Sequence, residues 1–75
     1  MAIQKTTMRT WVAVAETIYG VTVRFHEIDH KSGYMHGYVD GIHSPQVWAI
    51  NDGTVLSGYC NPDYNLNLDT FQILE

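Results

Sequence analysis

The clearest alternation of apolar and polar positions in the chain runs through residues 21–42. Two alternating runs flank the polar segment 29–33, whose residue types favour a turn. This pattern predicts a β-hairpin with its turn centred on Lys31. In that register residues 23, 25 and 27 pair with residues 39, 37 and 35.

The predicted hairpin has two faces of different chemistry. One face carries apolar side chains and glycines: Val21, Val23, Phe25, Met35, Gly37, Val39 and Gly41. The other face is mostly polar and aromatic, with Thr22, Arg24, His26, Ile28, Tyr34, His36, Tyr38 and Asp40. We therefore expect the first face to cover a core and the second to form an exposed surface.

Residues 10–17 allow two interpretations. In TWVAVAET, Trp11, Ala13 and Ala15 alternate with polar and apolar neighbours, as in a strand. Apolar residues in 8–19 also fall at helical spacing, with Gly20 placed as a C-terminal stop. The β-branched and aromatic content favours the strand, which would form a hairpin with residues 21–29.

The second half of the chain predicts three more short strands. Residues 46–50 (QVWAI) and 54–59 (TVLSGY) flank an Asp52-Gly53 turn. Its loop of two or three residues places Trp48 opposite Ser57 or Leu56. In residues 66–74 the apolar positions change parity, which predicts a bulge or bend near Asp69 and Thr70.

These elements predict one all-β domain over residues 1–75, with an ordered core of about 10–74. Five or six short antiparallel strands joined by turns are typical of a small barrel or sandwich, SH3-like or OB-like. An N-terminal helical turn is the variant that the helical spacing of residues 8–19 leaves open.

The chain is too short to bury a large core, because a domain of this size hides only about 60% of its unfolded surface. Cys60 is the only cysteine, so an intrachain disulfide is excluded. Self-association is a usual remedy, and we expect a homo-oligomer. A lone cysteine and the absence of any apolar run near the roughly 20 residues of a membrane helix predict a cytoplasmic protein without membrane contact.

The charge balance narrows the class of partner. Four basic residues and a net charge of −4 argue against direct binding to duplex nucleic acid. Only 16% of the residues are charged and 12% are aromatic, which is typical of proteins whose surface contacts a partner.

No arrangement of residues predicts a cofactor, a metal or a catalytic group. His26 facing His36, with Asp40 as a third ligand, could hold zinc, but four histidines without a zinc motif are more typical of a solvated face. Cys60 lacks an activating motif, and the paired carboxylates Glu27 and Asp29 lie beside a turn.

The candidate binding residues are instead Arg24, His26, Tyr34, His36 and Tyr38. Arginine and tyrosine are over-represented among the energetic anchors of protein interfaces. We therefore expect a non-catalytic accessory module that binds another protein, for example as an inhibitor. In size and composition the chain resembles the accessory proteins that viruses and mobile elements encode. Two alternatives remain: an oligomer with a small-molecule or nucleotide pocket between subunits, and a small histidine- or metal-dependent enzyme.

Overall fold

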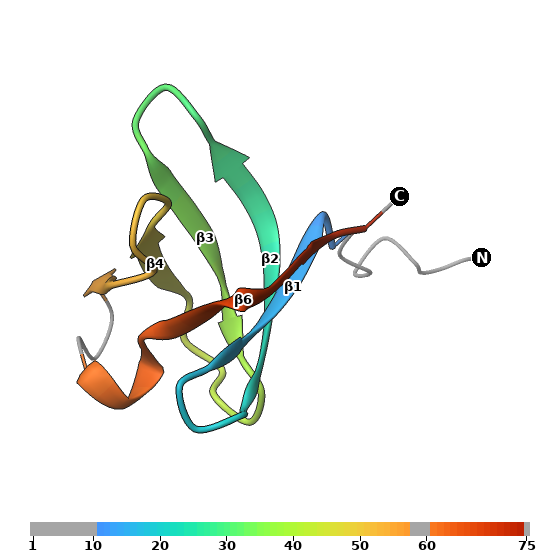
Figure 1. Ribbon diagram of the computed structural model, residues 1–75, viewed down its shortest axis with the longest axis vertical. Coiled ribbons are helices and arrows are strands. Elements are labelled where there is room, and N and C mark those ends of the chain that lie inside the picture. Colours follow the sequence, from blue (N-terminus) through green and yellow to red (C-terminus); the bar gives the residue numbers. More distant parts are fainter. Residues whose placement is uncertain (1–10, 58–60, 75) are drawn as a thin grey trace.

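The computed structural model describes residues 11–57 and 61–74, which form one antiparallel sheet (Figure 1). Its strands are β1 (Ala13–Thr17), β2 (Thr22–Asp29), β3 (Tyr34–Val39), β4 (Gln46–Ala49), β5 (Val55–Ser57) and β6 (Leu66–Ile73), and a short 3₁₀ helix (Pro62–Tyr64) precedes β6. The strand order is β5-β4-β3-β2-β1-β6, so every connection but the last joins neighbours. The all-β, antiparallel prediction is confirmed.

The core lies on the concave face of the curled sheet. Among the described residues, nine buried apolar ones form it: Ala13, Ala15, Val23, Phe25, Met35, Val39, Trp48, Val55 and Leu66. Phe25 is at its centre, because its ring meets Trp48 edge-on at 5.3 Å and Phe71 at 5.8 Å between centroids. Val21, predicted on this face, instead precedes β2 and is exposed.

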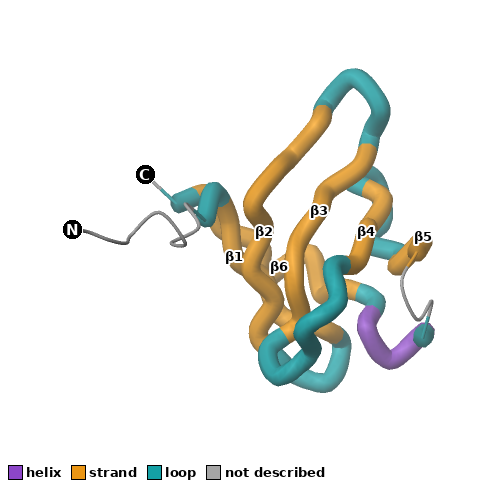
Figure 2. Tube along the Cα trace, turned by 180° about the vertical axis from the view of Figure 1, so that it is seen from behind, coloured by secondary structure: helices purple, strands orange, loops and turns teal. Residues whose placement is uncertain are grey.

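β6 crosses the open side of the sheet and curls it into a half-barrel (Figures 1 and 2). Hydrogen bonds close the gap between the two ends of the sheet. Leu66 N–H donates to Gly53 O at 2.9 Å, and Val55 N–H donates to the side-chain oxygen of Asn65 at 2.9 Å. Trp48 Nε1 donates to Tyr64 O at 2.8 Å, so the segment before β6 is tied to both β4 and β5.

The strand interpretation of the N-terminal segment is confirmed for β1, and the helical one is wrong there; residues 8–10 lie outside the described part. The alternation also predicted that Trp11 shares a face with Ala13 and Ala15, and this is wrong. Ala13 is the register partner of Phe25, and Val12 N–H also donates to Phe25 O. Val12 and Ala13 therefore both lie opposite Phe25. The alternation slips there, and Trp11 contacts Tyr38 on the convex face while Val12 packs against the core.

The register of the β2–β3 hairpin is confirmed at one end and wrong at the other. Val23 pairs with Val39 and Phe25 with Gly37, as predicted. A bulge at His26 then shifts the pairing. Beyond it Glu27 pairs with His36, Ile28 with Met35 and Asp29 with Tyr34.

The bulge has two local effects. It turns the apolar side chain of Ile28 inward, where it packs against the core. It also allows a four-residue loop, residues 30–33, in which Gly33 adopts φ +82° and donates its N–H to Asp29 O at 2.9 Å. The prediction that His26 lies directly opposite His36, and Ile28 on the polar face, is therefore wrong.

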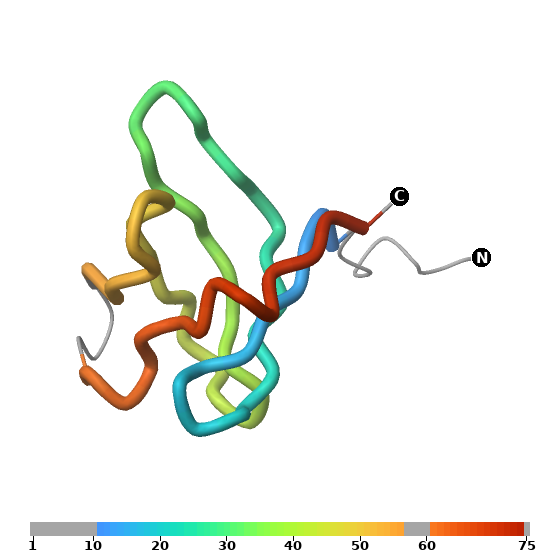
Figure 3. Tube along the Cα trace, viewed as in Figure 1, coloured from blue at the N-terminus to red at the C-terminus, as the bar shows by residue number. Residues whose placement is uncertain are grey.

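The β4–β5 loop repeats this design and is longer than predicted. Residues 50–53 form this loop (Figure 3). Gly53 has φ +75°, and Gly53 N–H donates to Ala49 O at 2.9 Å. As a result Trp48 pairs with Val55, and neither predicted partner is right. A register shift places Ser57 opposite Val47.

The irregularity predicted in the last strand is confirmed. Glu16 pairs with Asn67 but Val14 pairs with Gln72, so residues 68–71 bulge from the ladder. The hydroxyl of Thr70 accepts the Glu16 N–H at 2.8 Å, replacing a backbone acceptor. Phe71 can therefore pack against the core as Leu66 does, despite the opposite parity.

Candidate binding surface

The convex face of β2 and β3 carries the polar and aromatic side chains of the hairpin. Arg24 and Tyr38 are register partners there, because their neighbours Val23, Phe25 and Val39 are buried on the other face. Arg24 is exposed and Tyr38 is half-buried. These two side chains form the centre of the candidate site.

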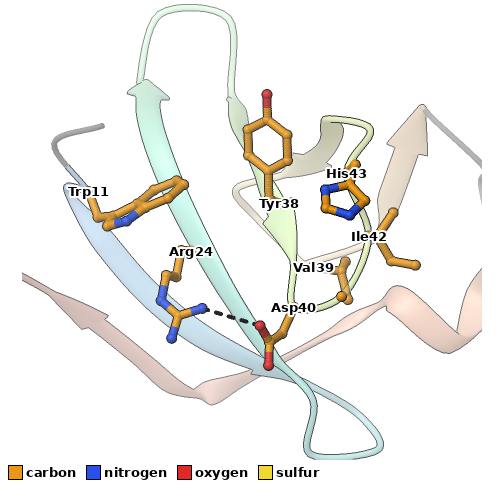
Figure 4. Close-up of a pocket in the computed structure, with 8 residues that line it drawn as sticks. Trp11, Arg24, Tyr38, Val39, Asp40, Ile42 and His43 are labelled. Atoms are coloured by element: carbon orange, nitrogen blue, oxygen red, sulfur yellow. Dashed lines mark ion pairs between the residues drawn. The ribbon is translucent and has the colours of Figure 1, made fainter. Parts of the chain in front are cut away.

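Trp11 reaches this centre from the segment before β1. Its ring meets that of Tyr38 edge-on, with the centroids 6.2 Å apart and the planes at 75°. This is a favourable geometry for two aromatic rings. Two large flat side chains from distant parts of the sequence therefore form one surface beside Arg24 (Figure 4).

A groove of about 300 Å³ lies on this surface, and we call it the aromatic groove. Its lining comprises Trp11, Arg24, Tyr38, Val39, Asp40, Gly41, Ile42 and His43. The chain turns at the end of β3, where Gly41 has φ +86° and Ile42 N–H donates to Val39 O at 2.9 Å. That turn places Ile42 and His43 at one end of the groove (Figure 4).

Arg24 and Asp40, which both line the groove, form an ion pair with Nη1 and Oδ1 3.6 Å apart (Figure 4). The two side chains are 45% and 67% exposed. An exposed pair at this distance contributes at most about 1 kcal/mol to stability.

The bulge keeps His26 on the convex face although it breaks the predicted pairing. The His26 ring is 5.9 Å from that of Tyr38 and 6.3 Å from that of His36, centroid to centroid. Four of the five predicted residues are thus brought together around Tyr38. Tyr34 shares their face, but it lies four positions along β3, roughly 13 Å from Tyr38 at the usual rise.

Asp40 does not act as the third ligand of a histidine metal site, since its carboxylate faces Arg24. Within residues 11–57 and 61–74, no three His, Cys, Asp or Glu side chains are grouped so that they could hold a metal ion. Cys60 lies outside the described residues.

The carboxylate of Asp29 has a local structural role. Its Oδ1 accepts the backbone N–H groups of Ser32 and Lys31, at 3.3 and 3.0 Å. These contacts, chiefly those with Ser32, lower the pKa of Asp29. Asp52 accepts the Thr54 N–H at 3.0 Å, which likewise lowers the pKa of Asp52. Both carboxylates stabilise the loops that define the ends of the hairpins.

The sequence did not reveal the complete groove. Asp40 was predicted on the correct face, but the alternation grouped Trp11 with Ala13 and Ala15, because the slip before β1 leaves no mark in the residue pattern. Ile42 and His43 follow Val39, the last residue of β3, so an alternation of apolar and polar positions could not place their side chains.

Comparisons of the chain with models of protein families, with curated proteins and with solved structures give no match. Among the described residues there is no helix with the length and apolar character needed to cross a membrane. The function therefore has to be argued from the surface itself.

Proposed function

We propose that this protein is a non-catalytic accessory module that acts in the cytoplasm by binding another protein through the aromatic groove and the adjacent histidines. The observation that carries the proposal is the grouping of Trp11, Tyr38 and Arg24 on one exposed face of the sheet. A module that only binds acts by covering its partner's surface, and it inhibits the partner where that surface is one the partner uses.

Residue type and rigidity both support a protein partner. Tryptophan, tyrosine and arginine are enriched among the interface residues whose truncation costs about 2 kcal/mol or more. Tyr38 sits within β3, and its ring is held by Trp11 and His26. A side chain that is already fixed loses little conformational entropy on binding.

The ion pair weighs against a nucleotide as the main ligand. Arg24 is the cation of the groove, and Asp40 stands 3.6 Å from it. A phosphate would have to displace or approach that carboxylate, which repels it. A protein surface, by contrast, can offer both a donor and an acceptor to the pair.

The proposal is tested by affinity capture with the tagged chain, comparing the double variant Trp11→Ala, Tyr38→Ala with the control Tyr19→Ala. Tyr19 is an aromatic residue of the β1–β2 turn that is 70% exposed. Loss of two anchors lowers recovery of the specific partner by about tenfold or more, whereas the control retains it. Equal recovery by the double variant, with an unchanged melting temperature, contradicts the proposal.

A thermal-shift screen tests the nucleotide alternative. A ligand at about 100 times its Kd stabilises a folded protein by about 2.7 kcal/mol. We expect no such stabilisation with nucleoside mono-, di- or triphosphates. A reproducible shift that disappears in Arg24→Ala but persists in Lys31→Ala would favour the nucleotide pocket over a protein-binding surface.

A further inference from the structure

We propose that the partner contributes a basic segment and that an arginine or lysine side chain of this segment enters the aromatic groove. This inference rests on the proposed function, because it specifies the chemistry of the protein that the same surface binds. The charge of the convex face and the lining of the groove support it.

The convex face is acidic around its aromatic centre. Glu16, Glu27, Asp29 and Asp40 lie on or at the ends of β1, β2 and β3 on this side, where Arg24 is the strand residue of opposite charge. Glu27 was brought to this face by the bulge at His26, which pairs it with His36. A face with this balance attracts a basic segment and accelerates its association.

The groove lining suits a long cationic side chain. The rings of Trp11 and Tyr38 line the groove, and arginine is the cation most often found against the face of such a ring. Ile42 supplies an apolar contact for the aliphatic stem. A side chain that lies along the groove therefore meets apolar, aromatic and charged groups in turn.

Asp40 can accept a second cation. Its contact with Arg24 joins one oxygen to one nitrogen at 3.6 Å, and 67% of its side chain is exposed. A carboxylate has about four acceptor positions, so an incoming guanidinium or ammonium can bind beside Arg24. The charge of Arg24 is already offset by Asp40, and the remaining carboxylates of the face favour the incoming cation.

The same charges argue against two other occupants. A second copy of this chain would bring an equally acidic face against the first, and like charges at close range are unfavourable. A protein with an acidic segment would meet the carboxylates of Glu27 and Asp40 in the same way. A basic partner is the one whose charge complements the face.

The test measures fluorescence anisotropy of three labelled peptides of equal length, in which Gly alternates with Arg, Glu or Ser. The Arg peptide binds, the other two do not, and its affinity falls as ionic strength rises from about 0.01 M to about 0.15 M. Asp40→Asn weakens binding by about tenfold, whereas the matched variant Asp63→Asn does not, because Asp63 lies in the 3₁₀ helix. Equal affinity for the Arg and Glu peptides, or equal effects of the two variants, overturns the inference.

Repeating the capture experiment with Asp40→Asn separates this inference from the proposed function. If the double variant Trp11→Ala, Tyr38→Ala abolishes capture of the specific partner and Asp40→Asn weakens capture by about tenfold, both the proposed function and the basic segment are supported. If the double variant abolishes capture and Asp40→Asn leaves it unchanged, the surface binds a protein but the basic segment is wrong. If neither variant changes capture, both proposals are wrong.

Discussion

Gly37 lies on the concave face of β3 directly opposite Phe25, and its missing side chain allows β2 and β3 to approach there. A Cβ at this position would collide with the carbonyl oxygen of Arg24 and come within 2.9 Å of Phe25 Cα. Both obstacles are backbone atoms that a rotamer change cannot move. The spacing of the strands under Arg24 and Tyr38 therefore depends on a glycine in the middle of β3.

We expect Gly37→Ala to lower the free energy of unfolding by about 2–3 kcal/mol, because overpacking forces the backbone apart. Gly20→Ala is the control. It has φ +83° but no atom within 4 Å of an added Cβ, so it costs only about 1 kcal/mol of backbone strain. Urea unfolding measures both. A smaller effect for Gly37→Ala than for Gly20→Ala would show that β2 and β3 are not closely packed there.

Two hairpin loops, and the contact between β5 and the segment before β6, depend on a few polar side chains. Asn65 provides the acceptor for Val55 N–H at 2.9 Å and thereby covers the edge of β5, which has no further strand beside it in the sheet of described residues. Asp29 and Asp52 hold the backbone of the β2–β3 and β4–β5 loops. The curvature of the sheet therefore depends on side-chain hydrogen bonds in the loops and beside β5.

Asn65→Ala leaves the Val55 N–H without its acceptor in a part-buried position. We expect a loss of about 1–3 kcal/mol in the free energy of unfolding, together with faster hydrogen exchange at Val55. Asn67→Ala is the matched control, because its side-chain oxygen accepts the Asp69 N–H in an exposed bulge. Similar losses for the two variants would mean that Asn65 does not seal the seam.

The aspartates of the two loops give stability that depends on pH. Their pKa values are lower in the folded chain than in the unfolded chain, so the unfolded state binds protons first as pH falls. Their contribution is complete above the unfolded value of about 3.9 and is lost as pH falls through the lower folded values. The double variant Asp29→Asn, Asp52→Asn should therefore lose less stability than the wild type between about pH 5 and pH 2. A parallel pH dependence of the two melting temperatures would contradict this.

The sequence predicted β1 to β4 well because buried positions alternate along each of them, and it failed where the alternation slips. Ile28 is the instructive residue. An isoleucine on a face otherwise occupied by Arg24, His36 and Tyr38 was a sign that the parity changes before the turn. The change of parity between Leu66 and Phe71 was the same signal, and there it gave the correct bulge. Trp11 left no comparable sign, since its neighbour Val12 is apolar as well.

At the scale of the whole molecule, the two edges of the sheet differ. Asn65 accepts the Val55 N–H at the edge of β5, whereas β6 has β1 as its one neighbour in the described sheet. Ile73, the last residue of β6, and Leu74, just beyond it, are 57% and 43% exposed. An uncovered edge with apolar side chains is a site for pairing with another strand. We therefore propose that the chain forms a homo-oligomer and that β6 is the strand through which it pairs.

Sedimentation equilibrium should give a mass at least twice the 8.5 kDa of one chain. Ile73→Lys places a charge on the β6 edge and should shift the mass to that of a monomer. Leu56→Lys is the control on β5, where the side chain is 44% exposed, and should leave the mass unchanged. A monomeric wild type, or dissociation by Leu56→Lys alone, would contradict pairing through β6.

We expect the convex face of β2 and β3 to contact a partner protein. Site-specific photo-cross-linking in cells tests this contact most directly. p-Benzoylphenylalanine at the position of Tyr34 keeps an aromatic ring on this face, where 45% of the native side chain is exposed. At the position of Leu56 the same group reports on the β5 edge. We predict a covalent adduct with one protein from position 34, lost in the Trp11→Ala, Tyr38→Ala background, and none from position 56. An adduct from position 56 alone, or one at position 34 that survives the double substitution, would contradict the account.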